Sequence, residues 1–275
     1  NWNAAPQAQQ SFAVGQGAQS IVFTSTAPAA AVVGGATYTP SATATSGLAV
    51  GFAIDVASSG VCTIAGGAVS FAGVGTCTVN ANQPGNADWS AAPQVQQSFP
   101  VGKGSQTITF APLTDSSISA SPLTLSATVN SPLTVSFSST TPLVCTVSGT
   151  SLDLLTTGTC TINANQSGDA NWNAAAQIQR SFNVTPPALV VTPGAASGTA
   201  VGASYSQANP AAGGTPPYAY ALASGALPAG TTLNAASGTV SGTPTTAGAF
   251  SYAIQATDSQ AVPATATGAT VSGTI

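Results

Sequence analysis

Polar and apolar residues alternate along short stretches throughout the chain. Clear examples are residues 107–110, 133–137 and 176–182, and residues that favour turns lie between such stretches. Alternation with a period of two places the apolar side chains on one face of a β-strand. No window combines a period of 3.6 residues with helix-capping residues. The pattern therefore predicts an all-β chain of short strands separated by turns, at the spacing typical of a β-sandwich.

A repeated segment divides the chain. Residues 1–12, 88–99 and 171–182 are three versions of one sequence, and they end at Phe12, Phe99 and Phe182. The intervals of 87 and 83 residues between these phenylalanines are close to the size of one immunoglobulin-like (Ig-like) domain. We predict a last strand of a preceding or incomplete repeat (1–14), repeat 1 (15–101), repeat 2 (102–185) and a different third unit (186–275). Because the linkers 15–17 and 102–104 are short, we expect tandem β-sandwich domains arranged end to end as a rod.

The repeated segment also contains all the tryptophans of the chain, Trp2, Trp89 and Trp172. A functional interpretation makes them platforms on which sugars stack. The structural interpretation places each one over the core of its own repeat, and their identical position in every copy favours it. The phenylalanines that end the segment are predicted core residues of the last strand.

Four cysteines form two like pairs. Cys62 and Cys77 are separated by 15 positions, and so are Cys145 and Cys160. Disulfides, reactive thiols and metal ligands are the three interpretations of such pairs. The strand context and the absence of histidine from the sequence favour the disulfides Cys62–Cys77 and Cys145–Cys160. Disulfides in small β-domains indicate an oxidising, extracytoplasmic location.

Charge is very scarce. Only 3% of the 275 residues are charged, with two basic and six acidic side chains, against about 25% in an ordinary soluble domain. Two basic residues, Lys103 and Arg180, are too few for a protein that binds nucleic acid. Acid–base catalysis lacks titratable partners, so we predict no enzyme, no catalytic residue and no cofactor. No apolar run is long enough for a membrane span.

A calcium site needs clustered carboxylates. When the repeats are aligned, none of their aspartates recurs at the same position, and Asp258 of the third unit stands alone. We therefore predict no metal site.

The third unit resembles a known family. Its motifs are Pro217-Tyr218, Leu227-Pro228-Ala229-Gly230 and Gly238 to Pro244, with Thr232 where leucine is usual. This run is similar to the putative-Ig (cadherin-like) domains of bacterial surface proteins. The two repeats resemble bacterial Ig-like repeats of the pattern G-x-C-T-I-x-A-x-Q, with tryptophan in place of the usual tyrosine. These resemblances imply β-sandwich modules of a large secreted or surface-anchored protein of the adhesin type.

Three functions are compatible with this sequence. The first is a non-enzymatic stalk region at the bacterial cell surface or outside the cell, whose partners are neighbouring domains, like copies of itself or an unidentified host or glycan ligand. The second is a subunit of a self-assembling filament or sheath, joined by strand addition through residues 5–14. Low charge removes repulsion between copies and favours this alternative. The third is a carbohydrate-binding module that uses Tyr38, Tyr205, Tyr218 and Tyr220.

Overall fold

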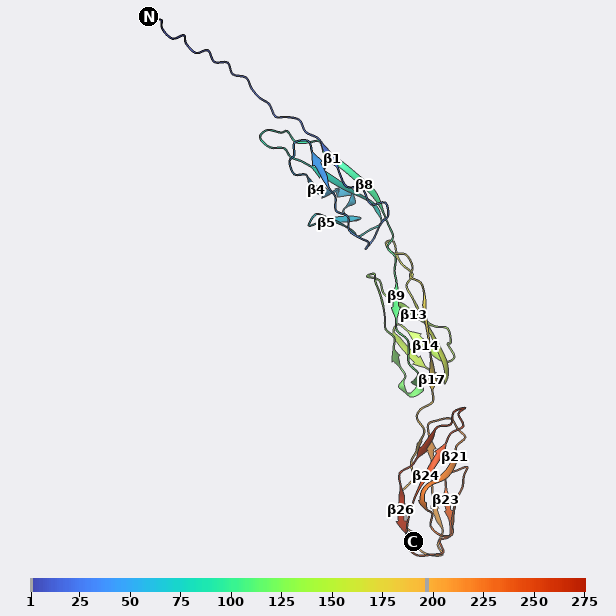
Figure 1. The fold of residues 1–275 in the computed structure, drawn as a ribbon. Helices are drawn as coiled ribbons and strands as arrows, with labels where there is room; N and C mark the ends of the chain where they lie inside the picture. The colour runs from blue at the N-terminus through green and yellow to red at the C-terminus, as the bar shows by residue number, and fades with distance from the viewer. Residues whose placement is uncertain (1, 196–197) are drawn as a thin grey trace. The chain divides into compact units, whose positions relative to one another are not determined.

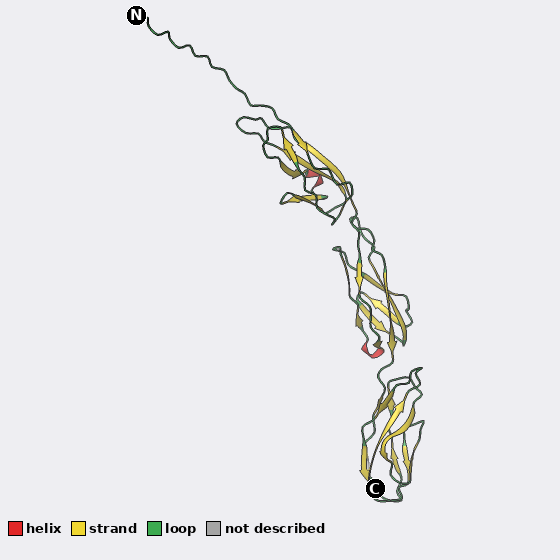
Figure 2. Ribbon diagram, viewed as in Figure 1, coloured by secondary structure: helices red, strands yellow, loops and turns green. Residues whose placement is uncertain are grey.

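The computed structural model describes residues 2–195 and 198–275, and it is built of strands joined by turns (Figures 1 and 2). The described residues contain no α-helix, only two 3-10 turns, η1 (Val56–Ser58) and η2 (Ile118–Ala120). The predicted all-β, Ig-like fold class is confirmed. Two compact bodies make up the chain, and each is described by itself. The first extends to Thr109 and includes Ala127–Val135 and Asn165–Ile178; the second holds Phe110–Ser126, Ser136–Ala164 and Gln179–Ile275.

Repeat 1 contains one four-stranded and two two-stranded sheets. Their orders are β2-β8-β7-β4, β1-β3 and β5-β6. The central pair β7-β8 is antiparallel, and β2 joins β8 in parallel. The strands are β1 (Ile21–Phe23), β2 (Ala31–Val32), β3 (Ala42–Ala44), β4 (Gly51–Ile54), β5 (Cys62–Ala65), β6 (Ala68–Phe71), β7 (Gly75–Asn82) and β8 (Val95–Gly102).

Repeat 2 has corresponding sheets, and one of them contains an additional strand, β11, where repeat 1 has only an isolated bridge between Tyr38 and Val69. The orders are β10-β17-β16-β13, β11-β15-β14 and β12-β9, and β10 joins β17 in parallel. The strands are β9 (Ile108–Phe110), β10 (Ser116–Ser117), β11 (Leu123–Thr124), β12 (Ala127–Val129), β13 (Ser136–Ser139), β14 (Cys145–Ser148), β15 (Ser151–Leu154), β16 (Gly158–Asn165) and β17 (Ile178–Thr185).

The third unit is organised around its longest strand, β24. This strand pairs with β21, β25 and β26, and two smaller sheets have the orders β19-β23-β22 and β18-β20. The strands are β18 (Val190–Val191), β19 (Tyr205–Gln207), β20 (Ala211–Ala212), β21 (Ala219–Ala226), β22 (Thr231–Leu233), β23 (Val240–Gly242), β24 (Ala249–Thr257), β25 (Thr265–Thr267) and β26 (Val271–Thr274).

The core of repeat 1 contains the alternate, inward-facing residues of its strands. Its members include Val69, Phe71, Val79, Phe99 and Val101. The ring of Phe99 meets those of Tyr38 and Phe71 edge-on, with centroids 5.6 and 5.9 Å apart. Such edge-on contacts are the favoured geometry of aromatic pairs in protein cores.

The core of the third unit is richer in tyrosine. Tyr205, Tyr220, Phe250 and Tyr252 lie in it, and the hydroxyls of Tyr205 and Tyr252 are 3.1 Å apart. Burial, reinforced by the hydroxyl of Tyr205, raises the pKa of Tyr252. A phenol in such a place stays neutral at physiological pH, so this pair is a structural hydrogen bond inside the core.

Candidate interaction site at the tryptophan end of each repeat

Each repeat begins at what we call its tryptophan end, where the entering chain crosses the turn that carries the tryptophan. In repeat 1 the amide of Gly17 donates a hydrogen bond of 2.8 Å to the carbonyl of Asp88, and the amide of Ser90 donates one of 2.9 Å to the carbonyl of Gly17. These bonds hold Gly17 in a parallel bridge with Trp89. A Cβ on Gly17 would lie 3.0 Å from the indole, so the glycine lets the backbone lie against the ring.

Repeat 2 builds its tryptophan end in the same way. Gly104 bridges Trp172, donating to the carbonyl of Asn171 and accepting from the amide of Asn173, both over 2.9 Å. A Cβ on Gly104 would lie 2.6 Å from the ring of Trp172, which leaves no room for a side chain there.

The turn that carries the tryptophan is closed by one side chain. In repeat 1, Oδ1 of Asn86 accepts from the amides of Asp88 and Trp89, both over 2.9 Å. In repeat 2, Oδ1 of Asp169 accepts from the amides of Asn171 and Trp172, both over 2.8 Å. Asparagine and aspartate both offer the oxygen that such a turn requires.

A hydrogen-bonded pair of glutamine side chains lies at each tryptophan end; Gln19, Gln83 and Gln106 are buried, and Gln166 is partly buried. Nε2 of Gln19 donates to Oε1 of Gln83 over 3.0 Å and to the carbonyl of Ser90 over 2.7 Å. Gln106 repeats both bonds with Gln166 and with the carbonyl of Asn173. Buried polar groups that are satisfied in this way fix one geometry, because breaking the network would leave a desolvated amide without a partner.

The tryptophan end of repeat 2 contacts repeat 1. Trp172 packs against the core cluster of repeat 1, and a Cβ on Gly34 would lie 2.7 Å from Cη2 of its indole. Beside the ring, the amide of Val74 donates to Oδ1 of Asn171 over 3.1 Å. We give the name glycine end to this part of repeat 1, which consists of Val33, Gly34 and Val74. Trp172 therefore joins one repeat to the next, whereas the sequence predicted that it packs over the core of its own repeat.

The other predicted core aromatics are divided between core and surface. Phe99 and Phe182 are both 4% exposed, in β8 and β17. Trp2 and Phe12 are 102% and 85% exposed and do not lie in a core, because residues 2–14 form no strand with the described residues. Residues 2–14 belong to no sheet, so their apolar side chains have no sheet of their own to pack on.

Both predicted cysteine pairs form disulfides in the structure, Cys62–Cys77 and Cys145–Cys160. Each bond joins the start of a short strand, β5 or β14, to the long strand β7 or β16. All four cysteines are at most 1% exposed. Because burial removes the sulfurs from solvent, these bonds are structural ones.

Asp258, the aspartate that stands alone in the sequence of the third unit, is 4% exposed and hydrogen-bonded within that unit. Its carboxylate accepts from the amides of Ala264 at 2.7 Å and Thr215 at 3.0 Å, and from the side chain of Gln260. Burial by itself would raise the pKa of this carboxyl, but the hydrogen bonds outweigh burial and hold the pKa below its usual value. Asp258 thus fastens the loop that follows β24. Among the described residues no group of three or more His, Cys, Asp or Glu could hold a metal ion.

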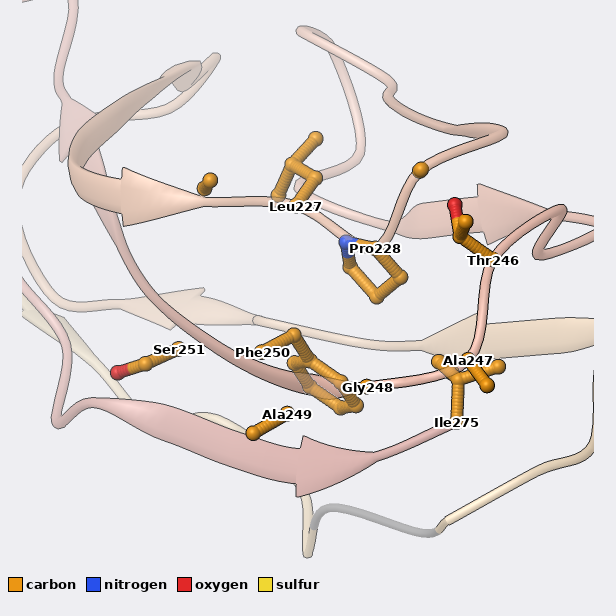
Figure 3. Close-up of a pocket in the computed structure, with 11 residues that line it drawn as sticks. Leu227, Pro228, Thr246, Ala247, Gly248, Ala249, Phe250, Ser251 and Ile275 are labelled. Atoms are coloured by element: carbon orange, nitrogen blue, oxygen red, sulfur yellow. The ribbon is translucent and has the colours of Figure 1, made fainter.

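Two hollows of about 220 Å³ each occur on the described surface. The one in Figure 3 belongs to the third unit, with Leu227 and Pro228 on one side and Phe250 on the other. Its lining is mostly alanine, glycine and apolar side chains, and it contains no titratable side chain. The second hollow lies in repeat 2, next to Leu123, Leu152 and Phe182. Neither presents the convergent polar groups that a specific ligand site uses.

The tyrosines proposed for sugar binding are core residues. Tyr38, Tyr205 and Tyr220 are between 3% and 8% exposed. The ring of Tyr218 packs against the core of the third unit, and its hydroxyl donates a hydrogen bond of 2.6 Å to the carbonyl of Gly213. Four rings arranged in this way offer no open aromatic platform, because a stacking site needs a ring face free for the sugar.

Among known proteins, the third unit matches one family. Residues 184–274, about a third of the chain, match the family described as Putative Ig domain. No curated protein matches the chain. The part of the chain that the structure describes has no helix long and apolar enough to cross a membrane.

Solved structures resemble the chain only distantly. A protocadherin gammaB7 EC3-6 cis-dimer structure is 11% identical, with a TM-score of 0.30 over 94% of this chain and 77% of that one. Drosophila N-cadherin EC1-4 is 12% identical, with a TM-score of 0.29 over 92% and 75%. The S-layer protein rSbsC(31-844) is 14% identical, with a TM-score of 0.31 over 90% and 39%. At these values the likenesses carry no conclusion about function.

Proposed function

We propose that this chain is a non-enzymatic structural region, of the stalk type, in a large bacterial cell-surface or secreted protein of the adhesin class. The observation that carries the proposal is the contact of Trp172 with the glycine end of repeat 1. A stalk has to hold each domain in a fixed relation to the next. This contact gives a short linker the side-chain packing that restricts its bending.

The joint combines three kinds of contact within the first compact body. The backbone continues from β8 through Gly102 and Lys103 into the bridge at Gly104. The indole of Trp172 lies on Gly34, and the amide of Val74 is hydrogen-bonded by Asn171. Apolar packing favours association without fixing direction, whereas the hydrogen bond is directional. Together they favour one arrangement of the joint over others.

The location rests on the disulfides. Two buried disulfides in domains of this size are typical of proteins from oxidising compartments, and they are rare in the cytosol. Few charges are available for ion pairs, so cross-links contribute a large share of the stability of such small β-domains.

Labelling of intact cells tests this location. An epitope inserted between Gly66 and Gly67 would sit in an open turn, since a Cβ on either glycine would have nothing within 4 Å. We expect an antibody to the epitope to label unpermeabilised cells of the source organism, or their secreted fraction, and a cytosolic control protein to stay unlabelled. Label that appears only after permeabilisation would overturn the proposed location.

One observation favours the alternative, a self-assembling filament or sheath. Phe12 and Val14 are 85% and 84% exposed, whereas their counterparts in β8, Phe99 and Val101, are 4% and 2% exposed. An exposed apolar segment that belongs to no sheet is suited to strand addition. Light scattering on a sizing column separates the candidates. A monomer of 26.4 kDa supports the stalk, and assemblies that are abolished by Phe12→Ser with Val14→Ser support the filament.

A further inference from the structure

We propose that the tryptophan end of repeat 1 is a docking surface for the glycine end of another Ig-like repeat, one that precedes it in the same protein. This inference rests on the proposed stalk function and names the neighbour that the stalk requires. The surface is made by Gly17, Asp88 and Trp89. Its occupant presents a small, open glycine turn to the indole and one backbone amide to the side chain of Asp88.

The Trp172 end shows what such a surface does when a neighbour is present. Both ends have the glycine–tryptophan bridge, the same two bonds across it, and the same side-chain closure of the turn. Both also have the hydrogen-bonded pair of glutamine side chains. The internal framework of the surface is therefore already formed in repeat 1, and ordering it would cost docking little free energy.

Asp88 occupies the position that Asn171 occupies in repeat 2. Oδ1 of Asn171 accepts from the amide of Val74 in the glycine end of repeat 1. An aspartate carboxylate offers the same kind of acceptor oxygen, so it is suited to the corresponding amide of a preceding repeat. A hydrogen bond from an amide to a carboxylate is also stronger than one to a neutral amide oxygen.

The chain itself indicates where the occupant comes from. Residues 5–14 have the pattern of residues 92–101, which end repeat 1. Phe12 precedes Gly17 by five positions, as Phe99 precedes Gly104. A repeat that ended in residues 5–14 would reach the Trp89 end through a linker of the same length as the one that leads to the Trp172 end.

A second copy of the chain does not offer an equivalent partner. The glycine end of its repeat 1 is already covered by Trp172. In repeat 2, β10 pairs with β17 as β2 pairs with β8, and this alignment places Ser119 where repeat 1 has Gly34. Pro186 and Pro187 there replace Lys103 and Gly104. Of the two repeats as the structure describes them, only repeat 1, which is followed by a tryptophan end, therefore has a glycine end.

Adding the missing neighbour tests the proposal. In an extended chain, a copy of residues 15–101 replaces residues 1–14. The tryptophans are replaced by 5-fluorotryptophan, so that each indole gives a ¹⁹F NMR resonance. The resonances are assigned from tryptophan-to-phenylalanine variants. We expect the Trp89 resonance to move towards the shift of Trp172 and to become as protected from a soluble paramagnetic probe as Trp172 is. A Trp89 resonance whose shift and probe accessibility do not change beside a folded added repeat would overturn the proposal.

Two glycine variants of the added copy give a matched control. Gly34 and Gly47 both have positive φ, 68° and 77°, so alanine strains the backbone at either position. A Cβ at Gly47 has nothing within 4 Å, whereas a Cβ at Gly34 faces the indole of the next repeat. We expect Gly34→Ala in the added copy to restore the accessibility of Trp89 and Gly47→Ala to leave it protected; equal effects would contradict docking through the glycine end.

The unextended chain provides a second measurement that does not depend on the added repeat folding. There Gly34→Ala should expose Trp172 and leave the Trp89 resonance unchanged. If Trp172 does not respond, the joint on which the inference is based is wrong. Failure of the cell-labelling experiment would instead reject the surface location and leave these in vitro results unaffected.

Discussion

The two cysteine-containing repeats and the third unit are all Ig-like, but different interactions stabilise them. Each repeat has one buried disulfide that ties a short strand to a long one. The third unit has no cysteine; its core contains Tyr205, Tyr220, Phe250 and Tyr252, and the buried carboxylate of Asp258 fastens a loop.

The difference shows two ways to stabilise a small β-domain that has few charged residues. A disulfide destabilises the unfolded chain by restricting it. Aromatic burial and saturated hydrogen bonds act on the folded state. The two kinds of domain should therefore respond to different perturbations.

Reduction should give the largest effect. Each disulfide closes a loop of 15 residues, and in the chain-entropy model its loss costs about 3 kcal/mol. Differential scanning calorimetry with and without reductant should show both repeats melting at a lower temperature. The third unit is the internal control and should not shift. Melting temperatures that do not change anywhere would contradict the comparison.

Trp172→Ala should have the next largest effect, confined to the repeats. Removing a half-buried indole from the joint should cost about 2 kcal/mol, because most of its apolar contact with repeat 1 is lost. Trp89→Ala is the matched variant, since its indole lies against Gly17 at the start of its own repeat. Denaturant unfolding should show repeat 1 losing its coupling to repeat 2 in the first variant and keeping it in the second.

Acid should affect mainly the third unit. Because hydrogen bonds depress the folded-state pKa of Asp258, its contribution to stability is complete above the usual carboxyl pKa of about 4 and is lost as the pH falls through the lower folded-state value. The melting temperature of the third unit should therefore fall below pH 4. Asp258→Asn should lower it at neutral pH and flatten this acid dependence. An unchanged acid dependence in the variant would assign the effect to another group.

The smallest expected effect lies within repeat 2. In repeat 1, Tyr38 is paired with Val69 across a β-bridge. The corresponding pair in repeat 2 is Leu123 with Leu152, and these two leucines line the hollow of about 220 Å³. Leu123→Phe should fill part of that space and stabilise repeat 2 by about 0.5–1 kcal/mol. Leu143→Phe is a suitable control, because that side chain is 84% exposed. A destabilising Leu123→Phe would show that the hollow cannot accept a ring.

The sequence predicted those parts of the structure that follow from local pattern. Alternation gave the all-β class, and the repeated spacing of Cys62 and Cys77 gave the pairing that the structure contains. The joint was not predictable in the same way. The recurrence of Trp89 and Trp172 is compatible with packing over the same repeat or over its neighbour, and only three-dimensional contacts distinguish the two.

The remaining differences have a similar origin. Phe12 has the pattern of a core residue, but burial depends on a sheet that residues 2–14 do not have. In the sequence Asp258 is a lone carboxylate, and its hydrogen-bond donors, Thr215 and Ala264, come from separate loops that the sequence does not bring together. Tyr38 and Tyr220 could belong to a surface or a core until the strands on which they lie were paired.

The state of the four cysteines in the native protein tests the account most directly. The protein would be taken from its source organism, quenched in acid, unfolded and treated with a maleimide that adds mass to each free thiol, before and after reduction. The account predicts no labelled cysteine before reduction and four afterwards, as expected for two disulfides formed outside the cytosol. Four labelled cysteines before reduction would contradict both the stabilisation of the repeats and the proposed location.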